Sequence, residues 1–204
     1  RPETVVEYRI KKLKDAGIHR MGFGIEHGND KFRREVVGRK YSNQLVIERM
    51  RIPKEHGVQF SVNNIIGFPD ETRELAFDTV ELNRQVASDT LSCSTFVPFH
   101  GTALRDMCVQ KGYINPDLIC PTNSDRSVLN MPRPFLRPEE MEGLRRVFTM
   151  YVKFPADRWP EIAQAEKLTP DGDAVLEKLR EEYIQTFLAY PDSDIEKINA
   201  TEIE

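Results

Sequence analysis

Hydrophobic and polar residues alternate in three short segments of the chain, at about residues 18–26, 58–66 and 90–97, as in β-strands with one buried face. A strand buried on both faces would be almost continuously apolar. The second segment instead has one polar face, which predicts that this face lines a wet or ligand-filled space. Its apolar face holds Val58, Phe60, Val62 and Ile66, and its polar face holds Gln59, Ser61, Asn63 and Ile65, with Asn64 as an exception.

Segments with helical periodicity precede and follow each predicted strand. Helix and strand alternate from the first residues to about residue 112, which predicts parallel strands joined by right-handed crossovers. Three such strands cannot close a barrel, which needs about eight, so we predict an α/β fold built on a partial (β/α) barrel. The helices are expected over residues 4–16 with Thr4 as the cap, between Asn29 and Gly38, between Ser42 and Gly57, over about 72–87, and from Thr102 to Gly112.

The character of the chain changes after residue 112. Residues 113–137 contain four prolines among several polar residues, which predicts an irregular connection. A helical C-terminal extension is expected over residues 138–204, with helices at about 138–154 and 173–190 and a fraying polar end from residue 191. The predicted organisation is therefore 1–112, 113–137 and 138–204.

Composition narrows the class of protein. With 204 residues, 39% hydrophobic and 30% charged, the chain can form a globular domain of ordinary composition. The net charge of -4 and the scattering of Lys and Arg among Asp and Glu give no support for a nucleic-acid partner. No apolar run approaches the length of a membrane span and no signal sequence is present, so the expected location is the cytoplasm.

The ends of the predicted strands carry the candidate site, because parallel sheets bind ligands at the carboxyl ends of their strands. Gly22 and Gly24 leave room for a ligand on the polar face, and Glu26 is a hydrogen-bond acceptor at its rim. A dinucleotide-binding fingerprint is not favoured, because the two glycines lie inside the strand and His27 stands where the third should fall. His27 and His100 follow strands and could contact a substrate, but ordinary loop residues remain the simpler interpretation.

Four motifs stand in register along the first half of the chain. They are Gly-Ile-Glu-His-Gly at 24–28, Gly-Arg-Lys-Tyr-Ser at 38–42, Ile-Ile-Gly-Phe-Pro-Asp-Glu-Thr at 65–72 and Val-Pro-Phe-His-Gly-Thr at 97–102. Together they resemble the second half of a radical S-adenosylmethionine (SAM) domain over roughly residues 1–112, and are most similar to the group that often carries an N-terminal cobalamin-binding domain.

The resemblance implies an open barrel that holds SAM in its lumen, with the three strands here as strands four to six. Glu26 is then expected to contact the ribose or amino-acid part of SAM, and Arg39 to pair with the SAM carboxylate. The fifth-strand pattern of the family, Gly-x-Ile-x-Gly-x-x-Glu, falls on Asn63, Ile65, Gly67 and Asp70, where Ile65 and Gly67 alone match. Ile65 is expected to pack on adenine, and Phe96 and Pro98 are expected to close the adenine side. These assignments require Glu26, Ile65 and Gly67 to lie within one ligand's reach.

The family also binds a [4Fe-4S] cluster through a Cys-x3-Cys-x2-Cys loop. Cys93, Cys108 and Cys120 do not have this spacing and are expected to be ordinary thiols, so the cluster ligands are expected outside this chain, which would not be competent alone. No residue is assigned a catalytic or metal-binding role. The implied partners are an external electron donor and a small-molecule or unknown substrate, and a cobalamin cofactor is compatible with the resemblance.

Two alternatives belong to other classes. The first is a scaffold that keeps the fold without the cluster and binds a ligand or partner without catalysis. The second is an ordinary (β/α) barrel enzyme of the aldolase or phosphate-binding type. Against the second, the chain has no strand-end lysine suited to Schiff-base chemistry and no glycine-rich phosphate loop in the expected place.

Overall fold

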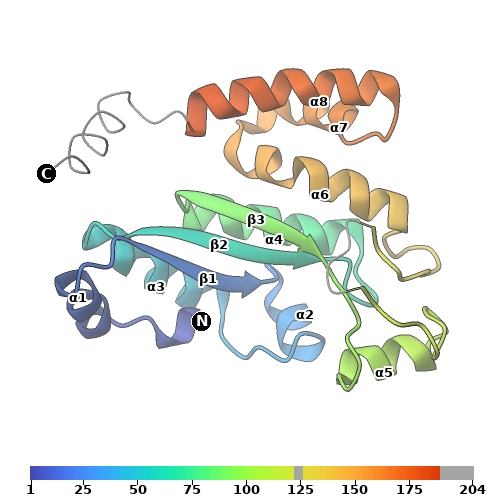
Figure 1. The fold of residues 1–204 in the computed structure, drawn as a ribbon, viewed down its shortest axis with the longest axis horizontal. Coiled ribbons are helices and arrows are strands. Elements are labelled where there is room, and N and C mark those ends of the chain that lie inside the picture. Colours follow the sequence, from blue (N-terminus) through green and yellow to red (C-terminus); the bar gives the residue numbers. More distant parts are fainter. Residues whose placement is uncertain (122–125, 189–204) are drawn as a thin grey trace, which may run out of the picture.

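A computed structural model describes residues 1–121 and 126–188 of the chain. Its sheet contains three parallel strands in the order β1 (Arg20–Glu26), β2 (Gln59–Ile66) and β3 (Thr90–Thr95) (Figure 1). The carboxyl ends of all three strands therefore lie at one edge of the sheet. The predicted α/β class with parallel strands is confirmed, and the numbering of these strands as four to six of a barrel stays an expectation from the resemblance.

Helices follow the strands as the periodicity predicts, and short polar side chains begin most of them. The predicted caps Ser42 and Thr102 each accept the backbone N–H three residues later. The prediction that Thr4 caps the first helix is wrong, because Pro2–Thr4 form a 3-10 turn and the Thr4 hydroxyl donates to the Arg1 carbonyl at 2.9 Å. The helices are α1 (Glu7–Asp15), α2 (Asp30–Glu35), α3 (Asn43–Glu55), α4 (Arg73–Val86) and α5 (Ala103–Gln110).

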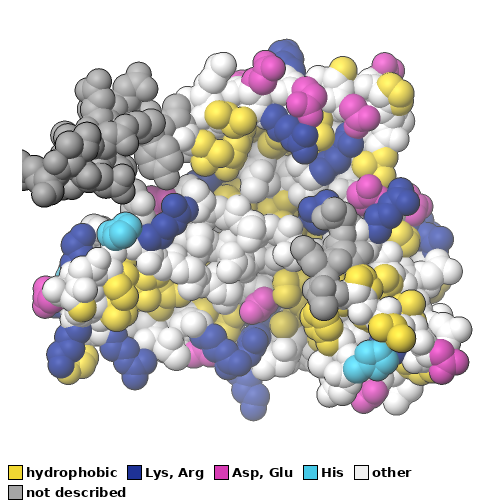
Figure 2. All heavy atoms as spheres, viewed as in Figure 1, with side chains coloured by type: hydrophobic (Ala, Val, Ile, Leu, Met, Phe, Trp, Pro, Cys, Tyr) yellow, Lys and Arg dark blue, Asp and Glu magenta, His cyan; other side chains and the backbone are white. Residues whose placement is uncertain are grey.

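The two faces of the sheet have opposite surroundings. Phe23, Phe60 and Val62 point to a core shared with α1, α3 and α4 and are almost completely buried. On the other face Asn63 and Ser92 are exposed, and the described residues leave this face open. Figure 2 shows that the centre of this face consists mostly of backbone and uncharged polar atoms. The open polar face is the one that the alternation predicts.

Asn64, the polar residue in the apolar pattern of β2, is 1% exposed and is paired below the sheet. Its amide donates to the Asn83 side chain of α4 at 3.1 Å and accepts from it at 2.8 Å. It also donates to the carbonyl of Ser92 in β3 at 3.1 Å. Because a buried amide without partners is costly, this reciprocal pair explains how the strand tolerates it.

The C-terminal part adds helices beside β3 and α4, where α6 (Pro138–Lys153) packs on both. Among the described residues, 111–137 form no helix or strand, but the segment supplies Leu129, Met131 and Leu136 to the second core. The last helix, α8 (Pro170–Tyr183), begins three residues earlier than predicted because the Thr169 side chain caps it. A short helix, α7 (Trp159–Ala165), precedes α8, and a π-helical segment, Ile184–Leu188, follows it.

The predicted end of the last helix at residue 190 and the predicted fraying end lie outside the described residues. In the part of the chain that the structure describes, no helix is both long enough and apolar enough to cross a membrane.

Candidate functional site

A cavity of about 420 Å³ lies at the carboxyl ends of the strands. Its lining combines the charged side chains of Glu26 and Arg39 with three hydroxyl-bearing residues and with aliphatic and aromatic side chains. This combination suits a ligand that has both a charged part and a flat apolar part. The residues that line it include Glu26, Arg39, Ile65, Phe68, Phe96 and Phe99.

A larger hollow of about 520 Å³ lies elsewhere, between the start of α4, α6 and the α7–α8 turn. Its polar groups are largely engaged with one another, because Arg73 forms a bidentate ion pair with Glu166. The cavity at the strand ends is the stronger candidate despite its smaller volume, since that edge is where parallel sheets place their ligands.

Glu26 lies in a three-residue turn at the end of β1. The N–H of His27 donates to the carbonyl of Ile25 at 2.9 Å, and Glu26 between them has a φ of 69°. A non-glycine residue in this region is strained, at a cost on the order of 1–3 kcal/mol. The register with β2 also shifts here. The turn directs the Glu26 side chain back over β1.

The glycines of β1 have different surroundings. A Cβ atom on Gly24 would lie 2.8 Å from Glu26 Oε1, so this glycine makes room for the Glu26 carboxylate. A Cβ on Gly22 would meet nothing closer than Ser61 Oγ at 3.4 Å. The space that the sequence predicts beside Gly24 is therefore filled in part by the protein's own carboxylate.

Arg39 reaches the same place from the segment between α2 and α3. Its guanidinium lies 3.8 Å from Glu26 Oε1, and both side chains are about one quarter exposed (27% and 22%). This segment is held by Tyr41, whose hydroxyl donates to the carbonyl of Ile25 at 3.0 Å. Burial raises the pKa of Tyr41 to about 12, so this hydroxyl keeps its proton at neutral pH.

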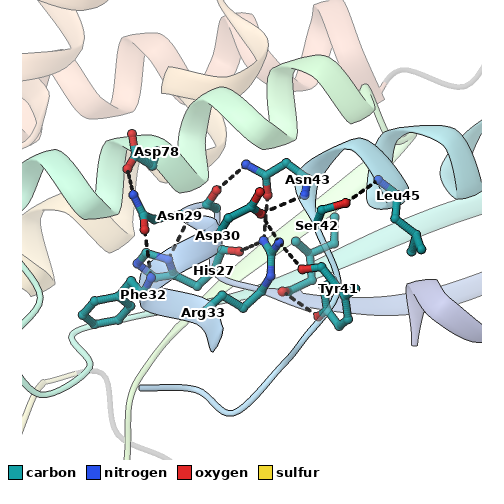
Figure 3. A network of polar contacts seen from close by, with 12 residues as sticks. His27, Asn29, Asp30, Phe32, Arg33, Tyr41, Ser42, Asn43, Leu45 and Asp78 are labelled. Atoms are coloured by element: carbon teal, nitrogen blue, oxygen red, sulfur yellow. Dashed lines mark hydrogen bonds and ion pairs between the residues drawn. The ribbon is translucent and has the colours of Figure 1, made fainter. Parts of the chain in front are cut away.

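Arg33 organises the loop that follows β1 (Figure 3). Its fully buried guanidinium donates to the carbonyls of His27 at 2.6 Å and Tyr41 at 2.7 Å, and it pairs with Asp30. Burial lowers its pKa, and the Asp30 carboxylate opposes that shift. Sequence reasoning missed Arg33 and Tyr41, because an arginine in a short polar helix and a single tyrosine give no sign of burial.

The end of β2 contributes Ile65 and Phe68 to the cavity wall. Gly67 lies between them but does not line the cavity, and its φ is 80°. A Cβ there would overlap the Met141 sulfur of α6, which belongs to a flexible side chain, so it is chiefly the conformation that requires glycine. Sequence reasoning placed the acidic residue of this motif at Asp70, which instead contacts Lys111 and the Tyr113 hydroxyl.

Glu71 was the acidic residue missed by sequence reasoning. Its side chain is fully buried, and its carboxylate accepts the backbone N–H groups of Gly67 and Phe68, the latter at 3.0 Å. Its neighbour Asp70 could not be excluded from the sequence, because both follow the proline of the same motif.

The end of β3 places Phe96 in the cavity wall but turns Pro98 away from it. The carbonyl of Pro98 accepts from the Arg105 guanidinium at 3.1 Å, which also binds the carbonyls of Pro116 and Leu118. These hydrogen bonds hold the loop, which presents Phe99, 49% exposed, at the cavity.

The remaining predicted site residues lie apart from the cavity. Asn63 is exposed on the open face of β2, and its side-chain oxygen accepts from Ser92 Oγ at 2.9 Å. His27 is completely buried, whereas His100 is exposed beyond β3. The structure thus brings Glu26, Arg39, Ile65 and Phe96 together, with Gly67 next to them along the chain.

The thiols do not fit a cluster site. Within the described residues, no group of three or more His, Cys, Asp or Glu side chains is arranged to hold a metal ion. Burial raises the pKa of Cys93 well above its usual value and that of Cys108 to about 11, so both are protonated thiols at neutral pH. Cys120 accepts from Arg105 and donates to the Pro98 carbonyl, both at 3.3 Å.

Comparison with known proteins gives a consistent result. The model of the radical SAM superfamily matches residues 2–82. An uncharacterized methyltransferase of Pyrococcus horikoshii is 30% identical over 109 residues, which is 53% of this chain and 24% of the relative. A tRNA-2-methylthio-N(6)-dimethylallyladenosine synthase of Halalkalibacterium halodurans is 26% identical over 110 residues, or 52% of this chain and 20% of that protein. A Bacillus cereus protein of the same name is 35% identical over 75 residues, covering 36% of this chain and 15% of that relative.

Among solved structures, coproporphyrinogen III oxidase from Escherichia coli, described as a radical SAM enzyme, is similar with a TM-score of 0.45 at 20% identity. The matched part is 48% of this chain and 23% of that enzyme. The chain thus spans about a quarter or less of each of these proteins. The family match includes β1, the Glu26 turn, the Arg39 segment and β2. Residues 2–82 are therefore similar to the radical SAM superfamily.

Proposed function

We propose that this chain supplies part of the SAM-binding wall of a radical SAM enzyme. One observation carries the proposal: Glu26, Arg39, Ile65 and Phe96 come from separate segments and line one cavity at the carboxyl ends of parallel strands. The family match over residues 2–82 supports it. Under this proposal the predicted roles of Asn63, Gly67 and Pro98 are indirect, because these residues do not line the cavity.

The residues present fit an adenosyl ligand with a charged end. Arg39 would bind the ligand carboxylate, for which its planar fork is suited, and would exchange part of its contact with Glu26 to do so. Glu26 would accept from ribose hydroxyl or ammonium groups. Ile65 and Phe96 offer apolar surface to the adenine ring.

The radical chemistry itself would come from SAM and an iron–sulfur cluster. Because no three His, Cys, Asp or Glu side chains of the described residues are grouped to hold a metal ion, the proposal gives these residues no role as cluster ligands. This chain's own contribution would be to bind and orient the ligand and to keep water away from its apolar part. Cobalamin and an external electron donor stay expectations from the resemblance.

A SAM titration of the chain, followed by isothermal titration calorimetry and by NMR chemical shifts, tests the proposal. We expect R39Q and E26Q each to weaken binding at least about tenfold, since a hydrogen bond to a charged group contributes about 1.5–3 kcal/mol. R20Q is the matched control, because Arg20 lies on the same face at the opposite end of β1 and is exposed. No SAM binding by the unaltered chain, or equal affinities for R39Q and the unaltered chain, would refute the proposal.

The substrate is a separate question. The sequence predicts no nucleic-acid partner from its net charge of -4, but two of the relatives are named as tRNA-modifying enzymes, which does not support that prediction. Titration with unmodified tRNA at low and at physiological salt addresses it directly, because phosphate contacts make such binding steeply salt-dependent. Salt-sensitive binding would establish an RNA partner, and its absence would favour a small-molecule substrate.

A further inference from the structure

His27 and Glu71 form a fully buried pair that does not line the cavity. Both side chains are 0% exposed, and His27 Nε2 lies 3.0 Å from Glu71 Oε1. The other ring nitrogen, Nδ1, accepts the backbone N–H of Asn29 at 3.0 Å. Since Nδ1 accepts, the ring proton is on Nε2 and is donated to the carboxylate. The pair joins the loop after β1 to the loop after β2.

The carboxylate of Glu71 makes further contacts within its own loop. Its Oε2 accepts the N–H groups of Gly67 and Phe68. Its backbone carbonyl accepts the N–H of Leu136, just before α6, at 2.9 Å. A buried carboxylate with this many donors is well compensated. Through its carboxylate and its backbone carbonyl together, Glu71 joins its own loop to the loop after β1 and to the segment before α6.

The joined loops carry cavity residues on either side of the pair. Glu26 directly precedes His27, and the backbone N–H of Phe68 donates to the Glu71 carboxylate. The strained turn at Glu26 can persist only if its neighbours are held in place. On one side Tyr41 holds the carbonyl of Ile25; on the other, Arg33 holds the carbonyl of His27, and Glu71 holds its ring.

We infer that the His27–Glu71 pair is a positioning element, which sets Glu26 and Phe68 relative to each other across the cavity and thereby controls affinity for the adenosyl ligand. The inference rests on the proposed function for the identity of that ligand. The His27 ring is completely enclosed, so it cannot contact a ligand or substrate directly. The inference gives it an indirect role through Glu71. It also makes Glu71, rather than Asp70, the acidic residue on which the end of β2 depends.

The experiment compares H27L and H27Q in the full chain, with two measurements. The first is the Kd for SAM, and the second is hydrogen exchange of the Gly67 and Phe68 amides without ligand. Leucine removes both ring contacts, so we expect SAM affinity to fall at least tenfold and both amides to exchange faster. Glutamine can donate to Glu71 and accept from Asn29, so H27Q should recover most of the affinity.

A matched control separates positioning from general stability. N83L breaks a different buried polar pair, Asn64–Asn83, which lies below the sheet and away from the cavity. It should lower the free energy of unfolding but leave the SAM Kd within about twofold. If H27L does not fold, the isosteric E71Q takes its place and should weaken SAM binding in the same direction.

Each outcome bears on the inference. Unchanged SAM affinity in folded H27L or E71Q would overturn it, and so would an equal loss in N83L, which would show that any destabilisation has this effect. If the unaltered chain does not bind SAM, the proposed function fails. The amide exchange of Gly67 and Phe68 then still decides whether His27 holds the second loop.

Discussion

Gly28 allows the loop after β1 to approach the backbone of α4, and replacing it by alanine should force the two apart. A Cβ atom at this position would overlap backbone atoms of Asp78 and Thr79. Backbone atoms of a helix cannot move aside as a flexible side chain can. We therefore expect G28A to displace the loop that carries Glu26 and His27.

The structure allows the magnitude to be worked out. Overpacking costs about 1–3 kcal/mol. Separation would also weaken two hydrogen bonds, from the Gly28 N–H to Thr79 Oγ1 at 2.9 Å and from the Asn29 amide to Asp78 at 2.7 Å. Each contributes about 0.5–1.5 kcal/mol. The expected loss is about 2–6 kcal/mol, a large part of the roughly 5–15 kcal/mol that stabilises a typical domain.

Urea unfolding followed by circular dichroism measures this loss, as a lower midpoint with an unchanged slope. G22A is the matched control. Gly22 lies in β1, the strand that precedes this loop, and an added Cβ there meets only Ser61 Oγ at 3.4 Å. We expect G22A to change the free energy of unfolding by less than about 1 kcal/mol, in either direction.

One result would refute the reasoning. If G28A unfolds at the same urea concentration as the unaltered chain, the loop does not pack on α4 as closely as described. The same conclusion would follow if G22A and G28A were equally destabilised, because the steric argument distinguishes the two positions.

The remaining predictions concern three buried groups. Burial raises the pKa of Tyr41 from 10.0 to about 12, so its contribution to stability is complete below pH 10 and is lost as the pH rises from 10 to 12. This loss amounts to at most about 3 kcal/mol, and in Y41F that part of the stability–pH curve should flatten. N64L should cost about 2–4 kcal/mol, because Asn83 loses both hydrogen bonds to Asn64 and keeps only the one to the Thr79 carbonyl. N64L/N83L should cost less than the sum of the single changes, and equal additive costs would contradict the reciprocal pair. R105K should lose the planar guanidinium that binds the carbonyls of Pro98, Pro116 and Leu118 together. Limited proteolysis should then cleave faster between residues 113 and 121, and unchanged cleavage would show that Arg105 does not hold this segment.

The local patterns of the sequence determined the class of fold and the orientation of the strands in the sheet. Alternation in β1 and β2 is a property of neighbouring residues, and a strand displays it wherever it lies. The open polar face and the position of Glu26 at the end of β1 could therefore be predicted. The motif resemblance similarly led to Arg39, Ile65 and Phe96, which the fold brings to one cavity.

Tertiary structure alone decided how these groups are supported. His27, Arg33 and Glu71 are polar residues in polar local contexts, and only packing between distant segments encloses them. Of two adjacent acids, Asp70 and Glu71, it is Glu71 that binds the backbone after β2. This choice depends on its contact with His27, which follows another strand. Gly24 and Gly28 look alike in the sequence, but one accommodates a carboxylate and the other a helix backbone. Local propensity acts over a few residues, whereas burial depends on which segments meet, so the chain sequence showed what could line the cavity but not what holds it in shape.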